Sequence, residues 1–152
     1  MINLIDFKYF IIEKKINEIG DYIPMEWEIS KEDLANATYE FYLGPEKYEV
    51  FFSKVRDKEV HIYFSVDGDR STITNTGNPL KVFSTVMGTI KDYLNKNQEI
   101  NTISFTPEKN LGPEDNRRLD IYLYYINKFF PNSRISLEEL PNGYVGVSAK
   151  IK

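Results

Sequence analysis

Cysteine is absent from the sequence, and histidine occurs once, at position 61. Without thiols the chain can form neither disulfides nor the cysteine-based zinc sites of small metal-binding domains. One imidazole excludes a site with several histidine ligands, so we expect no metal. The sequence also argues against a serine hydrolase, because Ser53, Ser65, Ser84 and Ser104 lack the glycine-flanked turn that presents the nucleophile in that class.

A strong excess of one charge is missing too. The 19 Lys and Arg residues stand against 23 Asp and Glu residues, which gives a net charge of −4. No overall field therefore draws the chain toward nucleic acid or an anionic membrane. Glu40, Glu46 and Glu49 lie among the aromatic runs, where carboxylates repel phosphate. We expect no nucleic-acid partner.

Long apolar runs are also absent, since no stretch approaches the ~18 residues of a membrane span. The first residues place Asp6 and Lys8 inside an apolar stretch, with no basic leader and no small-residue cleavage site. We therefore expect a cytoplasmic protein with no membrane partner.

Aromatic side chains are abundant: 11 Tyr and 10 Phe are spread along the whole length. A chain of this size buries roughly two-thirds of its unfolded surface, which is enough for a core without covalent support. No linker, repeat or break in composition divides the sequence. We predict a single domain over residues 1–152.

Two helices are expected before the first strand. Apolar residues at near-helical spacing predict a helix over residues 4–19, which Gly20 ends, with a strand that begins in residues 7–12 as the alternative. Ser30 and Asp33 form a capping box, which predicts a short second helix that runs toward Ala37.

The period then changes to that of strands. Aromatic and β-branched runs predict an antiparallel meander of three strands, and the further elements follow from turn and capping signals. The predicted strands are 38–43, 48–55, 60–66, a short one at 71–74, 101–106, 134–140 and 144–151, and the predicted helices are 80–95, capped by Asn78 and Pro79, and one from Gly112-Pro113 to Pro131. The fold class is α+β, with a mixed, mostly antiparallel sheet flanked by helices in the order α-α-β-β-β-α-β-α-β-β.

This order of elements resembles that of the GNAT-type N-acetyltransferase fold. The resemblance implies that the helix after the fourth strand begins at the pyrophosphate of acetyl-CoA, and that a later helix carries a Tyr near the thiol. On this sequence the backbone of Gly77, Asn78, Leu80 and Lys81 would hold the pyrophosphate, and Tyr125 would protonate the departing thiolate. The acetyl-CoA cofactor follows only if this implication holds.

The motifs of that family are incomplete in this sequence. The turn before the cofactor helix has two spaced glycines in the family, whereas only Gly77 is present here, and Pro79 lacks an N–H for the phosphates. In the later helix Arg118 stands where the family often has Asn. We therefore predict a non-catalytic or degenerate acetyltransferase-like domain that acts as a protein-binding or inhibitor module. The alternative is an acyl-CoA-dependent N-acyltransferase.

A looser similarity concerns origin. The segments Phe83-Ser-Thr-Val, Ile103-Ser-Phe and Arg118-Leu-Asp-Ile-Tyr122 are similar to a pattern in small uncharacterised proteins of tailed bacteriophages. This similarity implies a phage origin and names no activity.

Two side chains are candidates for proton transfer. His61 alternates with Tyr63 on one face of its strand, so His61 faces outward if Ile62 faces the core, and it could serve as a base for an amine substrate. Tyr125 is expected at the edge of an apolar helical stripe and Tyr122 in the core, and a phenol with a pKa of ~10 can act as a general acid. The alternatives are a strand histidine without a chemical role and a tyrosine that serves packing.

The aromatic strands also predict a surface. Tyr39 with Phe41, and Tyr63 with His61, are expected to line the face of the meander away from the core. A sheet with aromatic side chains on both faces needs helices, a ligand or a partner on the second face. We therefore predict a protein partner, with a homo-oligomer as the alternative.

Overall fold

The computed structural model describes residues 25–67, 79–107 and 117–152. The predicted helix 4–19, the short strand 71–74 and the residues Gly77 and Asn78 lie outside these ranges. The described elements follow one another as β1 Glu28–Glu32, β2 Asn36–Leu43, β3 Glu46–Arg56, β4 Glu59–Val66, α3 Pro79–Lys96, β5 Thr102–Phe105, α4 Arg117–Phe129, β6 Arg134–Glu139 and β7 Val145–Lys150.

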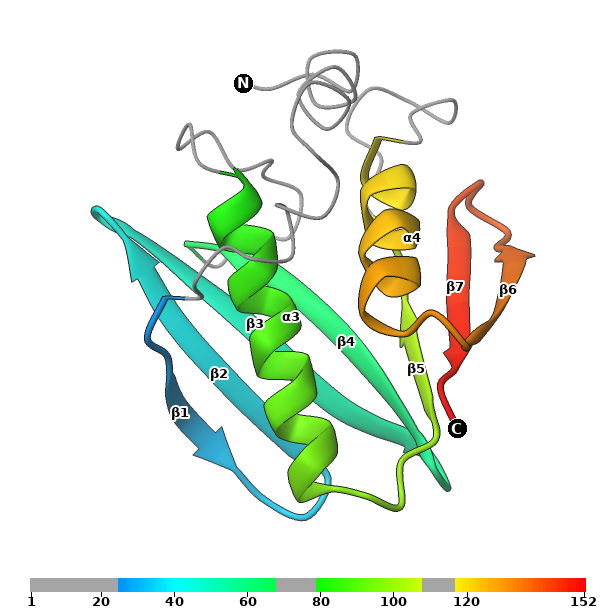
Figure 1. The fold of residues 1–152 in the computed structure, drawn as a ribbon, viewed down its shortest axis with the longest axis horizontal. Helices are drawn as coiled ribbons and strands as arrows, with labels where there is room; N and C mark the ends of the chain where they lie inside the picture. Colours follow the sequence, from blue (N-terminus) through cyan, green and yellow to red (C-terminus); the bar gives the residue numbers. More distant parts are fainter. Residues whose placement is uncertain (1–24, 68–78, 108–116) are drawn as a thin grey trace.

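The strands form one mixed sheet in the order β1-β2-β3-β4-β5-β7-β6 (Figure 1). Its neighbours are antiparallel except for β4 and β5, which are parallel. The predicted α+β class with a mostly antiparallel sheet is therefore confirmed. Neither described helix is both long enough and apolar enough to cross a bilayer.

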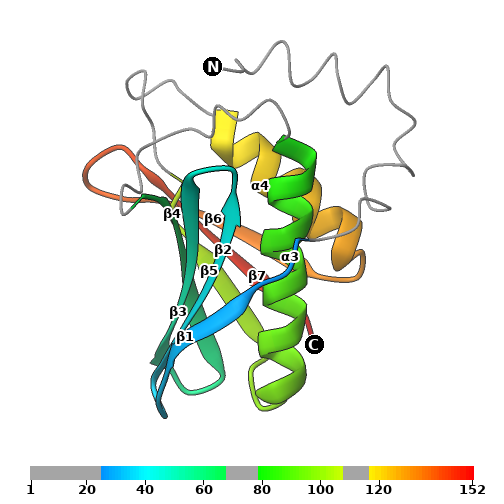
Figure 2. The same ribbon diagram turned by 90° about the vertical axis from the view of Figure 1, so that its left-hand side faces the viewer.

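Both described helices lie on the same face of the sheet (Figures 1 and 2). α3 runs over the part of the sheet formed by β2 to β4, and α4 lies over β5. The core lies between the sheet and the two helices. There the apolar residues that alternate along the strands contact the apolar stripes of the helices. Its largest fully buried side chains include Tyr39, Tyr48, Phe52, Ile90 and Tyr125.

The predicted helix from Ser30 toward Ala37 is wrong, because these residues enter β1 and the turn into β2. The side chain of Asp33 does accept backbone hydrogen bonds, but from Ala35 and Asn36, each at 2.8 Å. This Asx turn lowers the pKa of Asp33 through those two bonds. The same carboxylate chemistry serves helix caps and turns, so the motif alone could not distinguish them.

The predicted position of Tyr39 and Phe41 is also wrong. Both are buried beneath the helices, with exposures of 0% and 1%, because the other face of β2 is taken by Thr38, Glu40 and Tyr42. Phe41 stacks on Tyr48 with ring centroids 5.1 Å apart. The rings of Tyr39 and Phe41 therefore belong to the core and not to the opposite face of the sheet.

A partly buried hydrogen bond joins the sheet to α3 at the edge of this core. The Tyr39 hydroxyl donates to Asp92 Oδ2 at 2.6 Å, and Lys96 Nζ lies 2.9 Å from the same oxygen. Burial and the Asp92 carboxylate raise the pKa of Tyr39. Partial burial acts to raise the pKa of Asp92, but the hydrogen bonds from Tyr39 and Lys96 outweigh it, so the pKa is lowered. The charged form of Asp92 is thus the one that stabilises the fold.

We predict that Asp92→Asn lowers the free energy of unfolding by about 1 to 2 kcal/mol at pH 7, because the hydrogen bonds lose their charge assistance. A lowered native pKa adds stability above the unfolded value of ~3.9 and loses it as the pH falls through the native pKa. Urea unfolding at pH 7 and at about pH 2.5 should therefore show a difference between variant and wild type that shrinks in acid. The exposed Asp57→Asn is the matched control, and a difference that stays constant in acid would contradict the assignment.

Candidate functional site where β4 and β5 part

The two parallel strands are paired over only three positions. Glu59 pairs with Thr102, Val60 with Ile103 and His61 with Ser104. Beyond His61, β4 continues to Val66 without β5 beside it, and the two strands diverge (Figure 1). Beyond His61 the backbone N–H and C=O groups on that side of β4 are no longer paired with β5. A ligand could therefore approach these main-chain atoms where the two strands separate.

The N-terminal ends of α3 and α4 lie at the same end of the molecule as the carboxyl ends of β4 and β5 (Figure 1). In open sheets ligands bind outside the carboxyl ends of parallel strands, and helix N-termini there favour negative charge. α3 begins at Pro79, whose nitrogen carries no hydrogen to donate. The first backbone donor of that helix is therefore missing.

His61 lies at the point where the strands separate, since its pair with Ser104 is the last of the parallel ladder. Its Nδ1 is 2.8 Å from Ser104 Oγ, and the Ser104 hydroxyl donates to Glu59 Oε2 at 3.4 Å. The serine hydroxyl can donate to Glu59 and accept a hydrogen from Nδ1 at the same time, and this pattern of bonds would favour the tautomer of His61 that is protonated on Nδ1.

The predicted orientation of His61 is confirmed. Val60 and Ile62 are buried in the core, with exposures of 0% and 4%, and His61 is half-buried on the opposite face. Its ring lies 4.6 Å from that of Tyr63, which comes two residues later on the same face. A catalytic role for His61 remains a prediction.

The predicted edge position of Tyr125 is wrong. Its side chain is 1% exposed, and its ring stacks on Phe83 of α3 with centroids 5.5 Å apart. Tyr122, the expected core residue, is only half-buried and stacks on Phe105 of β5 at 5.2 Å. The helical pattern of α4 showed its apolar stripe but not that α3 would cover the edge of that stripe.

The structure therefore does not bring the two catalytic candidates together. His61 lies on the face of the sheet away from the helices, whereas Tyr125 is enclosed between α3 and α4 on the covered face. The neighbouring Tyr124 hydroxyl is buried without a hydrogen-bond partner among the described residues, and burial raises its pKa. Neither tyrosine is therefore exposed as a general acid at the place where β4 and β5 separate.

The predicted cofactor residues are only partly described. Leu80 contributes backbone to the first turn of α3. Lys81 lines a groove with Met25, Trp27 and Glu40, on the side of α3 near β1 and β2. No group of three His, Asp or Glu side chains among the described residues is arranged to hold a metal ion.

No family model, curated protein or solved structure matches the chain.

Ser104 and Glu59 are the members of this site that the sequence did not reveal. Alternation along β5 places Ser104 opposite the buried Ile103, which was readable from the sequence. Its contact with His61 was not, because it depends on the parallel register between strands 43 residues apart in the chain.

We predict that neutral His61 carries its proton on Nδ1, although free imidazole side chains favour Nε2. The single histidine makes this measurable from the ¹⁵N chemical shifts of labelled protein. Ser104→Ala should return the ring to the Nε2–H form, while Ser53→Ala, on the neighbouring strand position, should not. An Nε2–H tautomer in the wild type would contradict a hydrogen bond from His61 Nδ1 to Ser104.

Proposed function

We propose that the chain is a degenerate N-acetyltransferase-like domain that acts as a protein-binding module. The presence of β1 supports this proposal. With β1 counted, β4 is the fourth described strand and α3 follows it, as the cofactor helix follows the fourth strand in the fold that the chain resembles. The strands β4 and β5 separate at the end of the molecule where both described helices begin. This arrangement supports descent from a fold that binds a ligand at this place.

The enclosure of Tyr125 is the observation that carries the non-catalytic part of the proposal. A general acid must come within about 3 Å of the group it protonates. A ring that is 1% exposed and packed against Phe83 and Phe129 serves the core instead. The loss of a donor at Pro79, the first residue of α3, adds to the argument, because phosphate binding at a helix start depends on such N–H groups.

The binding surface in this proposal is the sheet face away from the helices. Phe51 and Tyr63 form a cross-strand pair there with ring centroids 5.9 Å apart, and His61 lies beside Tyr63. No described helix covers these half-buried rings. Tyrosine and phenylalanine side chains on an open, partly apolar surface are typical anchors for a protein partner.

A calorimetric titration with CoA and acetyl-CoA tests the non-catalytic part. We expect no heat and no change in unfolding temperature at millimolar ligand, and no transfer of acetyl groups to amine acceptors. A ligand present at one hundred times its dissociation constant would add about 2.7 kcal/mol of stability. Saturable binding with acetyl transfer would contradict the proposal.

The second candidate, an acyl-CoA-dependent N-acyltransferase, is favoured by the position of His61. His61 belongs to the last pair of the parallel ladder, where the strands separate, and an imidazole at such a position could act as a base for an incoming amine. The same titration separates the two candidates: a transferase must bind acetyl-CoA, and His61→Asn should then abolish transfer while CoA still binds.

A further inference from the structure

The strand β6 forms one edge of the sheet, and no strand of the described residues lies beyond it (Figure 1). The Leu140 N–H donates to Tyr144 O at 2.8 Å and closes the hairpin to β7, and the register back to Arg134 has no bulge. In an antiparallel ladder every second residue bonds to the same neighbour. The N–H and C=O groups of Ile135 and Leu137 therefore point away from β7, and such an edge can pair with another strand.

The side chains of β6 follow an order that is complementary to itself. Arg134, Ser136 and Glu138 lie on the face of the sheet away from the helices. Ile135 and Leu137 lie on the helix face, where their partners on β7 are buried. When a second β6 runs antiparallel with the two Ser136 residues opposed, each Arg134 lies opposite a Glu138. Each Ile135 then lies opposite a Leu137, so opposed side chains match in charge and in polarity.

The main-chain hydrogen bonds fit the same alignment. Ile135 and Leu137 carry the outward N–H and C=O groups, and the alignment places these two residues opposite each other. Opposed residues with such groups exchange both of their hydrogen bonds. Ser136 then forms a pair without hydrogen bonds at the two-fold axis, with its two Cα atoms about 4.5 Å apart. Leu137, which is 54% exposed in the single chain, is covered by the second copy.

The charges of β6 have no complement within the described sheet. Arg134 lies directly opposite Lys150 on β7, and like charges in opposed positions destabilise a sheet. Glu138 lies opposite Gly146, which has no side chain. None of the ion pairs among the described residues includes Arg134 or Glu138. A second copy supplies the missing opposite charge to both.

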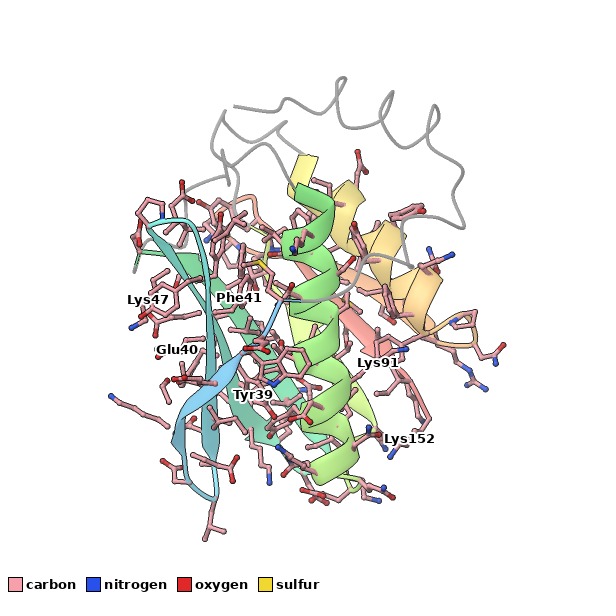
Figure 3. The ribbon with its side chains drawn as sticks, turned by 60° about the vertical axis from the view of Figure 1, so that its left-hand side comes forward. Tyr39, Glu40, Phe41, Lys47, Lys91 and Lys152 are labelled. Atoms are coloured by element: carbon pink, nitrogen blue, oxygen red, sulfur yellow. The ribbon has the colours of Figure 1, made fainter. Side chains whose placement is uncertain are left out.

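The other edge of the sheet is not suited to such pairing. The strand β1 contains a register shift, and a bulge interrupts the pairing of an edge strand. An alignment of two β1 strands centred on Ser30 brings Glu28 opposite Glu32, which are like charges. Glu40 on the neighbouring strand is already paired, because Lys47 Nζ lies 3.1 Å from its Oε2 on the side away from α3 (Figure 3).

We propose that two copies of this chain associate through β6 into a two-fold dimer whose sheet continues across the interface. Ser136 lies at the axis, with the pairs of Arg134 and Glu138 on either side of it. A single pair of short strands makes a smaller interface than the roughly 1,600 Å² of standard complexes, so the dissociation constant is on the order of 10 µM. The interface leaves the face of Phe51 and Tyr63 free, so it does not depend on the function proposed above, and variants that separate the copies keep that face.

Analytical ultracentrifugation of the full chain from about 1 to about 300 µM tests the association. The weight-average mass should rise with concentration from 17.8 kDa toward twice that value. Arg134→Glu and Glu138→Arg each oppose like charges, so each variant alone should dimerise at least tenfold more weakly. A 1:1 mixture of the two should associate as the wild type does, because the charges of one variant complement those of the other. Glu139→Arg makes the same charge change on the other face of β6 and should alter the dissociation constant less than about twofold.

Cross-linking locates the axis without a change of charge there. The chain has no cysteine, so Ser136→Cys gives each copy one thiol at the axis, within the Cα spacing of a disulfide. Mild oxidation should link this variant into a dimer. In Glu139→Cys the two thiols lie about 20 Å apart along the strands, so linking should be at least tenfold slower.

Four results would each overturn the proposal. They are a monomer at every concentration, single charge variants that associate like the wild type, a mixture of these variants that stays monomeric, and equal cross-linking at positions 136 and 139. The mixture distinguishes lost charge complementarity from lost folding, because an unfolded variant cannot be rescued by its counterpart.

Discussion

The parallel pairing of β4 with β5 over three positions is the constraint on which the rest of the structure depends. Parallel neighbours require a crossover between them, and α3 provides it across one face of the sheet. Because the pairing stops at His61 and Ser104, the two strands separate on the side where both helices begin. On the covered face, Phe83 of α3 stacks on Tyr125 of α4, and no described helix lies on the other face.

The core shows how the aromatic richness of the sequence is used. Rings of the strands contact rings of the helices, as in the pair of Phe52 and Tyr93, whose centroids are 4.3 Å apart. The Tyr39 hydroxyl donates a hydrogen bond to Asp92, whereas the buried Tyr124 hydroxyl has no such partner among the described residues. Most rings of the described residues therefore have a packing role, whereas Phe51 and Tyr63 lie on the other face of the sheet.

Sequence reasoning predicted the elements whose signals are local. The strands of the meander, the helix that begins at Pro79 and the final hairpin agree with their predicted positions within about two residues, because period and turn chemistry are encoded over short windows. Asp33 was misread because one carboxylate geometry serves both a cap and a turn. Tyr125 was misread because α3 covers it from another part of the chain. The link between His61 and Ser104 was missed because it requires the register of two strands that are distant in sequence.

We propose that this domain works through the sheet face that no described helix covers, and not through acyl transfer. Affinity capture from a lysate of the source organism tests it most directly, with Phe51→Ser and the equally apolar but remote Leu137→Ser as matched baits on β3 and β6. The account predicts one protein that the wild type and Leu137→Ser retain and that Phe51→Ser loses, while all three baits stay folded by circular dichroism. Retention of the same protein by Phe51→Ser, or no specific protein on the wild type, would contradict it.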